Sequence, residues 1–234
     1  MRIETTSSAL TNLRNAPRVT ESGPQGDVQQ NKSIGETPPK LVPQSELGRL
    51  AALFARGGKI SRLQRRLNKL KNKKCKIAAA KGTIACIDDN DLVYVGVDFL
   101  SEIFADGNED GEAILAGVLS HEWGHACAER PKSEAVQQMN WNEIFAERRA
   151  HEVFADEMSG KLLALMGYSI EPLVKFLTSQ KDTHNLKYHD QATRVEIMRK
   201  GFAEEKRKQT LAQDLFKTST YQNNYTSTLI DDDV

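Results

Sequence analysis

The sequence predicts a single α+β domain that is mostly helical and carries a small antiparallel sheet. Segments with helical hydrophobic period fill most of the second half of the chain, and only two short runs before them have the residue types of strands. At 234 residues the chain can bury a core of its own, as one domain of ordinary size does. We therefore expect one folded domain, residues 46–217, between two tails.

Both ends of the chain have the composition of disordered segments. Residues 1–45 are rich in Ser, Thr, Gln, Asn, Pro and Gly, so ordering them would bury too little apolar surface to offset the lost entropy. They predict a disordered leader, and residues 218–234 a flexible polar and acidic tail. The sequence shows no apolar signal-peptide core and no run of about 20 apolar residues. We expect a protein without an integral membrane segment, cytoplasmic or secreted by a route that needs no signal peptide.

The first predicted helix, about Ser45–Leu70, becomes strongly basic in its second half. Ten Lys or Arg and no acid lie in the segment 56–76, although the whole chain is neutral, with 32 basic and 32 acidic residues. An apolar stripe runs along it at helical spacing: Ile60, Leu63, Leu67 and Leu70. The segment fits a helix whose basic face is solvated and whose apolar stripe packs on the core. It also fits a surface for nucleic acid or an anionic membrane.

Two short runs, about Lys76–Ile87 and Leu92–Phe99, are the predicted strands. The residues between them, Asp88-Asp89-Asn90-Asp91, are strong turn formers. A turn of this length joins strands that run in opposite directions, so we expect a small antiparallel pair.

Two long helices follow the strands. After the turn at 106–108 the hydrophobic period becomes helical, with Asn108 as a plausible N-cap and acidic residues in the first turn, where the helix dipole favours them. This helix is predicted to run to about Arg130, because Pro131 stops it. The second is predicted over about Asn142–Met166, and two or three more helices precede the tail.

The first long helix contains His121-Glu122-Trp123-Gly124-His125. Histidines four residues apart lie on one helix face, about one turn of rise from each other, so both imidazoles can bind one zinc ion. Glu122 can then take a proton from metal-bound water, as the general base of a hydrolytic zinc site does. The alternative is a pair of buried histidines hydrogen-bonded to carbonyl groups. It is disfavoured because two histidines and an intervening carboxylate are costly to bury without a metal or other partners.

A catalytic zinc site takes a third protein ligand and leaves one position for water. The second long helix offers six candidates: Glu143, Glu147, His151, Glu152, Asp156 and Glu157. We expect Glu152 to be the ligand, with His151 as its main rival. Asp156, one turn further on, would accept the free ring N–H of a ligand histidine and so fix its tautomer.

These motifs resemble those of the gluzincin peptidases of the HtpX and BepA type, which have HExxH on one helix and Glu-x-x-Ala-Asp on a later one. Here the second box is Glu152-Val153-Phe154-Ala155-Asp156, and the similarity covers about Cys75–Gly201, over half the chain. The resemblance implies a zincin-like metalloprotease domain with an HExxH active-site helix. It would be a minimal soluble form, and its 26 residues between His125 and Glu152 also suit the related ImmA-type proteases.

The resemblance extends to the strand before the metal helix. The stretch Leu92–Leu100 is similar to the family's edge strand, which would align a peptide substrate by β-augmentation. Four of its residues would then bind the substrate: Val93, Tyr94, Val95 and Gly96.

A third segment, Tyr188–Glu196, resembles the family's histidine and arginine region, although Asp190 replaces the usual proline. By that resemblance His189 would contact the oxyanion or the metal, and Arg194 would anchor the site. His184 is a second candidate for the role of His189.

The residues and the resemblance together predict a zinc-dependent endopeptidase acting on a protein or peptide substrate. Zinc would polarise the scissile carbonyl, and Glu122 would carry a proton from water to the leaving amine. The leader makes a bacterial secreted effector protease one form of this hypothesis. The alternative is a metal-bound interaction module, recruited to partners, DNA or an anionic membrane through the basic segment 56–76. An intact Glu122 favours the enzyme, because a structural zinc site needs no base there.

Overall fold

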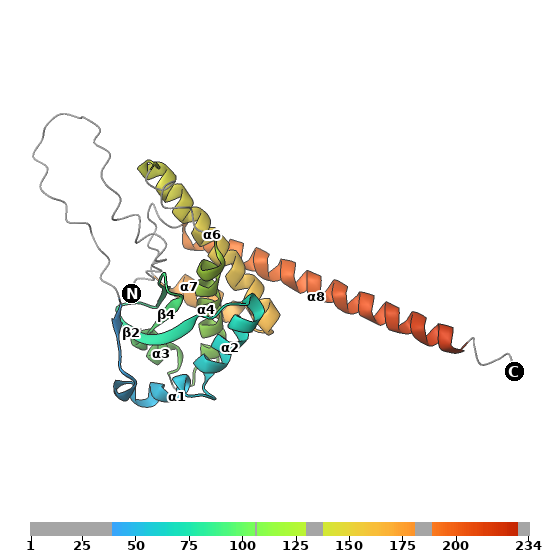
Figure 1. Ribbon diagram of the computed structural model, residues 1–234, viewed down its shortest axis with the longest axis horizontal. Helices are drawn as coiled ribbons and strands as arrows, with labels where there is room; N and C mark the ends of the chain where they lie inside the picture. The colour runs from blue at the N-terminus through green and yellow to red at the C-terminus, as the bar shows by residue number, and fades with distance from the viewer. Residues whose placement is uncertain (1–38, 106, 130–137, 181–188, 229–234) are drawn as a thin grey trace, which may run out of the picture.

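The structure is a computed structural model that describes residues 39–105, 107–129, 138–180 and 189–228, with side chains up to Phe216. Its strands are β1 (Lys40–Leu41), β2 (Lys76–Lys81), β3 (Ala85–Ile87) and β4 (Leu92–Gly96). Its helices are α1 (Ala51–Phe54), α2 (Lys59–Lys71), α3 (Val97–Ile103), α4 (Gly111–Cys127), α6 (Trp141–Met166), α7 (Glu171–Ser179) and α8 (Gln191–Thr228), and two 3-10 turns, Gln44–Glu46 and Gly48–Leu50, precede α1. The predicted mostly helical α+β fold is confirmed (Figure 1).

The sheet is mixed, whereas the sequence predicted an antiparallel one. Its order is β1-β2-β4-β3. β3 and β4 are antiparallel, and the side chain of Asp88 accepts hydrogen bonds from the N–H groups of Asn90 (2.8 Å) and Leu92 (2.9 Å) in the predicted turn. β2 runs parallel to β4. The predicted first strand is in fact two strands, because the chain reverses at Gly82, which has a φ of 86° that favours glycine.

The second predicted strand is shorter than expected, since β4 ends at Gly96 and α3 begins at Val97. A Cβ on Gly96 would lie 1.9 Å from the carbonyl oxygen of Thr83, so only glycine fits under the chain that connects β2 to β3. The N–H of Gly96 donates to the carbonyl of Ile84 (2.8 Å). This hydrogen bond lies at the last residue of β4, immediately before the chain enters α3.

Helix boundaries also differ from the prediction. The predicted first helix is split, because Gly58 packs against the end of α1 so closely that a Cβ there would lie 2.3 Å from the carbonyl oxygen of Ala52. Asn108 does not cap α4. Its side chain instead accepts from the N–H of Asp110 and donates to the carbonyl of Ile103, holding the turn before the helix. α4 ends at Cys127, three residues before the predicted end.

The two predicted tails are partly covered by the structure. Within the predicted leader, Lys40–Leu41 pairs with β2 as strand β1, so the ordered fold begins before residue 46. Residues 1–38 lie outside the described ranges. At the other end α8 continues through the predicted start of the tail at residue 218 as far as Thr228, and residues 229–234 lie outside the description.

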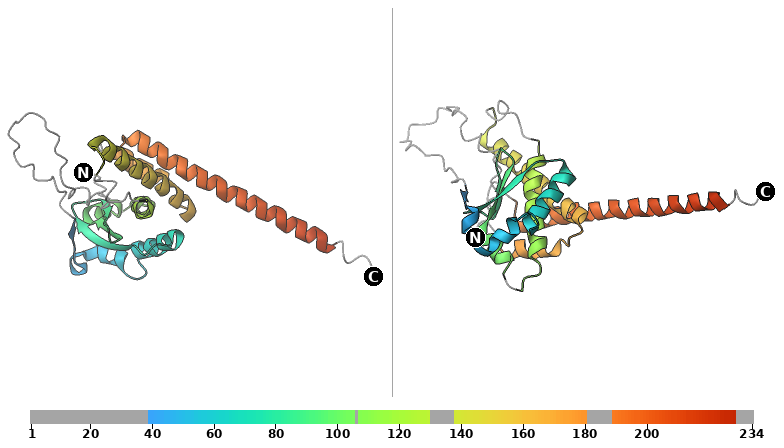
Figure 2. Two further views of the ribbon diagram at one scale, coloured as in Figure 1. Left: turned by 45° about the horizontal axis from the view of Figure 1, so that its top comes forward. Right: turned by 60° about the horizontal axis from the view of Figure 1, so that its bottom comes forward.

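Helix α4 forms the centre of the domain, since 13 of its 17 residues are buried. α2 and the sheet cover one side of it, and α6 and α7 cover the other (Figure 1). The indole N–H of Trp123 donates to the side-chain oxygen of Asn68 on α2 (3.2 Å). The long α8 lies beside α6 and then extends away from the body (Figure 2). No helix in the described ranges has both the length and the apolar composition needed to cross a membrane.

The backbones of α6 and α8 are in direct contact at two glycines. A Cβ on Gly160 would lie 2.0 Å from the carbonyl oxygen of Met198, and one on Gly201 would lie 2.3 Å from that of Glu157. Because neither position can hold a side chain without moving a helix, the two glycines set the distance between α6 and α8.

We predict that Gly160→Ala lowers the free energy of unfolding by about 1–3 kcal/mol, because the added methyl group must push the two backbones apart. Thermal and denaturant unfolding would measure the loss. Gly57→Ala is the control, since a Cβ there meets nothing within 4 Å. Equal stability of the two variants would contradict the prediction.

Candidate metal centre

Two histidines of α4 and one glutamate of α6 form a buried cluster. His121 and His125 direct their Nε2 atoms at each other, 3.0 Å apart. Oε2 of Glu152 lies 3.4 Å from Nε2 of His121, and its Oε1 lies 3.6 Å from Nε2 of His125. One atom from each residue lies within 4.8 Å of the others, so the group could hold a metal ion. The structure thus brings together the three ligands expected from the sequence.

The cluster forms because α4 and α6 cross with almost no space between them. A Cβ on Gly124 would lie 2.7 Å from the Cα of Ala155. Glu152 precedes this contact by one turn of α6, and the two histidines lie on either side of Gly124 in α4. A second contact holds the crossing, because the hydroxyl of Ser159 donates to the carbonyl of Gly117 (2.9 Å).

Gly124 and Ala155 stand in the two motifs, but their spacing alone did not predict that the helices touch there. Gly124 is one of the two unspecified positions within HExxH, and Ala155 lies inside the Glu-x-x-Ala-Asp box. A glycine in one motif and an alanine in the other indicate close backbone packing, which could have predicted where the two helices meet.

Asp156 and Arg194 support the cluster from outside. Nδ1 of His121 lies 2.9 Å from Oδ1 of Asp156. Arg194 donates to both oxygens of the same carboxylate, from Nε and from a terminal nitrogen, each at 2.8 Å. Asp156 can therefore hold the proton of His121 on Nδ1 and leave Nε2 with its lone pair toward the cluster.

The start of α8 determines where Arg194 lies. The side chain of Asp190 accepts from the N–H of Thr193 (2.8 Å), and its carbonyl accepts from the N–H of Arg194 (3.1 Å). Asp190 thus acts as the N-cap of the helix. His189 precedes it and is half-buried, and its contact with the oxyanion or the metal stays a prediction. His184 lies outside the described residues.

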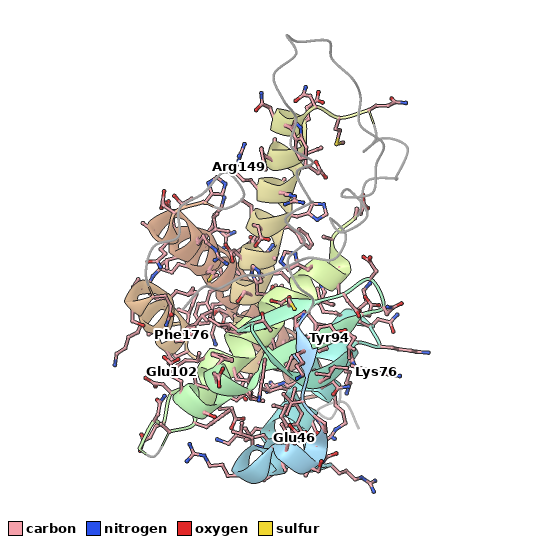
Figure 3. All side chains as sticks on the ribbon, turned by 90° about the vertical axis from the view of Figure 1, so that its left-hand side faces the viewer. Glu46, Lys76, Tyr94, Glu102, Arg149 and Phe176 are labelled. Atoms are coloured by element: carbon pink, nitrogen blue, oxygen red, sulfur yellow. The ribbon has the colours of Figure 1, made fainter. Side chains whose placement is uncertain are left out.

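The other candidates on α6 have different partners. Nε2 of His151 lies 3.3 Å from Oε1 of Glu147, and His151 is not part of the ligand group. Glu143 completes a capping box with Asn140 at the start of α6. In Figure 3 the part of α6 that carries Arg149 projects from the body. Glu152, three residues further along the helix, lies beside the two histidines of α4.

The expectation that β4 is a substrate-binding edge strand is wrong. Val93, Tyr94, Val95 and Gly96 belong to a strand that pairs with β2 on one side and β3 on the other. Its backbone groups are therefore used within the sheet. β3 is the outer strand of the described sheet on this side.

A cavity lies between β3, α4, α7 and α8 and reaches His121 and Glu122. Its walls are mainly apolar side chains, among them Ile84, Ala85, Val118, Leu173, Leu177 and Met198. Glu122 is completely buried, and within the described part of the chain both of its carboxylate oxygens lack a hydrogen-bond partner. A buried carboxylate without a partner is costly, so its position next to this cavity fits a group that acts on a bound molecule.

Burial and neighbouring charges separate the pKa values of the site. Burial raises the pKa of Glu122 to about 7, with His121 opposing the shift. Burial disfavours the charged form of His121, but the carboxylates of Asp156 and Glu152 outweigh it and raise its pKa to about 10. Burial lowers the pKa of His125 to about 4, because the opposing charges of Glu152 and Asp156 do not outweigh it. Burial also opposes ionisation of Asp156, but Arg194 outweighs this and holds the pKa of Asp156 well below its usual range.

The fold and the site define an α+β protein with a buried His-His-Glu group that could hold a metal ion. Comparison of the chain with protein-family models, with curated proteins and with solved structures finds no match. What can be said of its function therefore depends on the residues and their geometry.

We predict that metal binding near neutral pH releases about one proton, because a pKa of about 10 keeps His121 protonated in the metal-free protein and a histidine must be neutral to bind a metal. The pKa of His121 is higher in the folded protein than its unfolded value of about 6.5. Protonation of His121 therefore stabilises the metal-free fold fully below pH 6.5, and this stabilisation is lost as the pH rises toward 10. Metal affinity should accordingly rise with pH. Calorimetric titration with zinc in two buffers of different ionisation enthalpy measures the proton, and identical heats in both buffers would refute its release.

We predict that Arg194→Lys weakens metal binding by about 10–100-fold, because lysine cannot hold both oxygens of Asp156 and the carboxylate then positions His121 less well. Arg199→Lys is a matched control, since Arg199 makes the same two-pronged contact with Glu171 on the exposed surface. Competition with a zinc-binding dye would measure both affinities. Equal affinities would show that the contact between Arg194 and Asp156 is not needed.

Proposed function

We propose that the chain is a zinc-dependent endopeptidase. The convergence of His121, His125 and Glu152 on one point carries the proposal, together with the carboxylate of Glu122 beside them, which has no hydrogen-bond partner among the described residues. Two zinc–nitrogen bonds of about 2.0–2.1 Å at the tetrahedral angle place the nitrogens about 3.3 Å apart. The donor separations of 3.0, 3.4 and 3.6 Å fit this value. Magnesium and calcium prefer sites made of oxygen ligands alone, so a site with two imidazoles favours zinc over them.

Each polar residue of the site then has a role in peptide hydrolysis. Zinc, when bound, supplies a Lewis acid for the scissile carbonyl and the attacking water. Glu122 takes a proton from that water and passes it to the leaving amine, and a pKa of about 7 allows both transfers near neutral pH. Arg194 orients Asp156, and Asp156 orients His121. His189 would contact the oxyanion from the segment before α8.

The substrate is proposed to be an extended segment of a protein. An extended chain can add to a sheet only at an outer strand, and among the described strands β3 is the one beside the site. Ala85 of this strand lines the cavity next to Glu122. We therefore assign substrate alignment to β3 in place of β4, with the apolar cavity receiving a substrate side chain.

The resemblance to gluzincins of the HtpX and BepA type supports the proposal. Both of its main motifs lie where a hydrolytic site needs them, on helices that cross at the cluster. The proposal that the chain is a secreted effector protease depends on the composition of residues 1–45. The place where the chain works stays a prediction.

A metal-bound interaction module is the second candidate, and the exposed basic face of α2 favours it. Such a module has no use for Glu122 as a base. Burying that carboxylate without a partner among the described residues costs stability, and the described fold shows no structural benefit from it. We therefore prefer the enzyme and treat the basic face separately below.

We predict that Glu122→Gln lowers peptide hydrolysis by about 10²–10⁴-fold and leaves zinc content unchanged, since the amide keeps the shape of the side chain but cannot accept the proton. Glu152→Ala should lose the zinc as well as the activity. Denatured casein and a cell lysate serve as substrates, and zinc is measured in each purified protein.

Glu102→Gln, an exposed change on α3, is the control for both variants. Full activity of Glu122→Gln would refute the role of the base. Absence of zinc from wild type refolded with zinc would refute the site itself.

A further inference from the structure

The basic segment found in the sequence forms an exposed face along α2 and the loop that follows it. Arg62, Arg65, Arg66, Lys69 and Lys74 are all exposed. Two of the ten cations in 56–76 have acidic partners among the described residues, because Lys59 and Arg62 both lie near Glu112 (3.3 and 3.9 Å). The lysine group, defined as Lys69, Lys71, Lys73 and Lys74, forms no ion pair within the described part of the chain.

This face is rigid, because the rest of α2 belongs to the core. Ile60, Leu63 and Leu67 are each at most 2% exposed, so the apolar stripe of the helix is not available to a partner. Asn68 fixes the end that bears the lysine group. Its side chain binds both backbone groups of Cys75 (2.9 and 3.0 Å) and accepts from the indole of Trp123 (3.2 Å). The cations are therefore presented on a preformed surface and need no ordering on binding.

Two exposed leucines lie among the cations. Leu70 is 40% exposed between Lys69 and Lys71. Leu165, at the end of α6, is 39% exposed, and its carbonyl accepts from the guanidinium of Arg66 (3.5 Å). The acidic turn at 88–91 marks the limit of the surface, because the N–H of Lys76 donates to the carbonyl of Asp91 (3.0 Å).

Cations interspersed with exposed aliphatic side chains suit the surface of an anionic membrane. Lysines gain from the negative headgroups, and leucines gain by entering the layer between headgroups and acyl chains. A nucleic acid would use the cations for its phosphates but would have no use for the leucines. The segment 56–76 also contains no aromatic residue on which a base could stack.

The position of α2 leaves the metal centre accessible from other directions. α2 packs on α4 through Trp123, which is two residues from His121 and therefore about 200° round the helix. α2 and the projecting half of α6 lie on different sides of α4 (Figure 1). Contact through the basic face would thus not cover the cavity beside Glu122.

We propose that the basic face of α2 docks this domain on the surface of an anionic membrane, with the lysine group against the headgroups and Leu70 in the interfacial layer. This goes beyond the proposed peptidase activity and does not depend on it. The binding is electrostatic and superficial, so added salt weakens it.

The first test is sedimentation of the full chain with phosphatidylcholine vesicles that contain or lack phosphatidylserine. Wild type should bind only the anionic vesicles. Replacing all four residues of the lysine group by Gln should weaken binding by more than about a hundredfold, since each charge near the surface contributes roughly fivefold. The same four residues changed to Arg should preserve binding and show that the surface tolerates substitution.

The control for net charge changes four exposed lysines elsewhere to Gln, at Lys40, Lys81, Lys175 and Lys200. This variant should bind the anionic vesicles almost as wild type does. An equal loss in both Gln variants, or no loss in either, would overturn the assignment to α2.

The second test distinguishes a membrane from a nucleic acid. Leu70→Trp should bind anionic vesicles at least as tightly as wild type, and its fluorescence should shift to the blue, beyond any shift of wild type, on those vesicles alone. Random-sequence duplex DNA should bind more weakly than the vesicles at the same salt. Tighter binding to DNA, or no additional blue shift with vesicles, would overturn the membrane proposal.

Discussion

The candidate metal centre depends on the close crossing of α4 and α6 at Gly124 and Ala155. Helices separated by ordinary side chains lie about 8–10 Å apart, and small residues at the crossing let these two approach more closely. Glu152 can therefore reach both histidines. Gly160 and Gly201 likewise let α6 and α8 approach closely where these two helices meet. Three helices are thus held in fixed register by residues that have almost no side chain.

This register allows a row of charges to be buried. The groups follow one another in the order Arg194, Asp156, His121 and Glu152, so each charged group lies beside one of opposite sign. Burying any one of these charges alone would cost a large free energy of desolvation. Contact with a neighbour of opposite charge offsets part of that cost for each of them. Glu122 stands outside the row. The raised pKa of Glu122 follows from that position, because burial acts on its carboxylate and no hydrogen-bond partner in the described part of the chain compensates.

The structure also separates the regions to which two functions are assigned. The cluster and its cavity lie in the core, where the low dielectric strengthens charge interactions. The basic face lies on the outside of α2, where cations remain hydrated and can meet a partner. α4 connects the two, since one side of it carries the ligands and the other packs on α2 through Trp123. The core stripe of α2 is what makes its basic face a fixed surface.

The sequence by itself determined the long helices, the pair of candidate ligand histidines and the turn before β4. Helical period, the spacing of His121 and His125 and the turn residues 88–91 are short-range features, and neighbouring residues largely decide their conformation. The tertiary structure alone decided the parallel pairing of β2 with β4, the internal position of β4 and the break at Gly82. It also chose Glu152 over His151 and placed Arg194 on Asp156. These outcomes join segments far apart in the chain, and they depend on which backbones can approach closely, a property that local pattern does not contain.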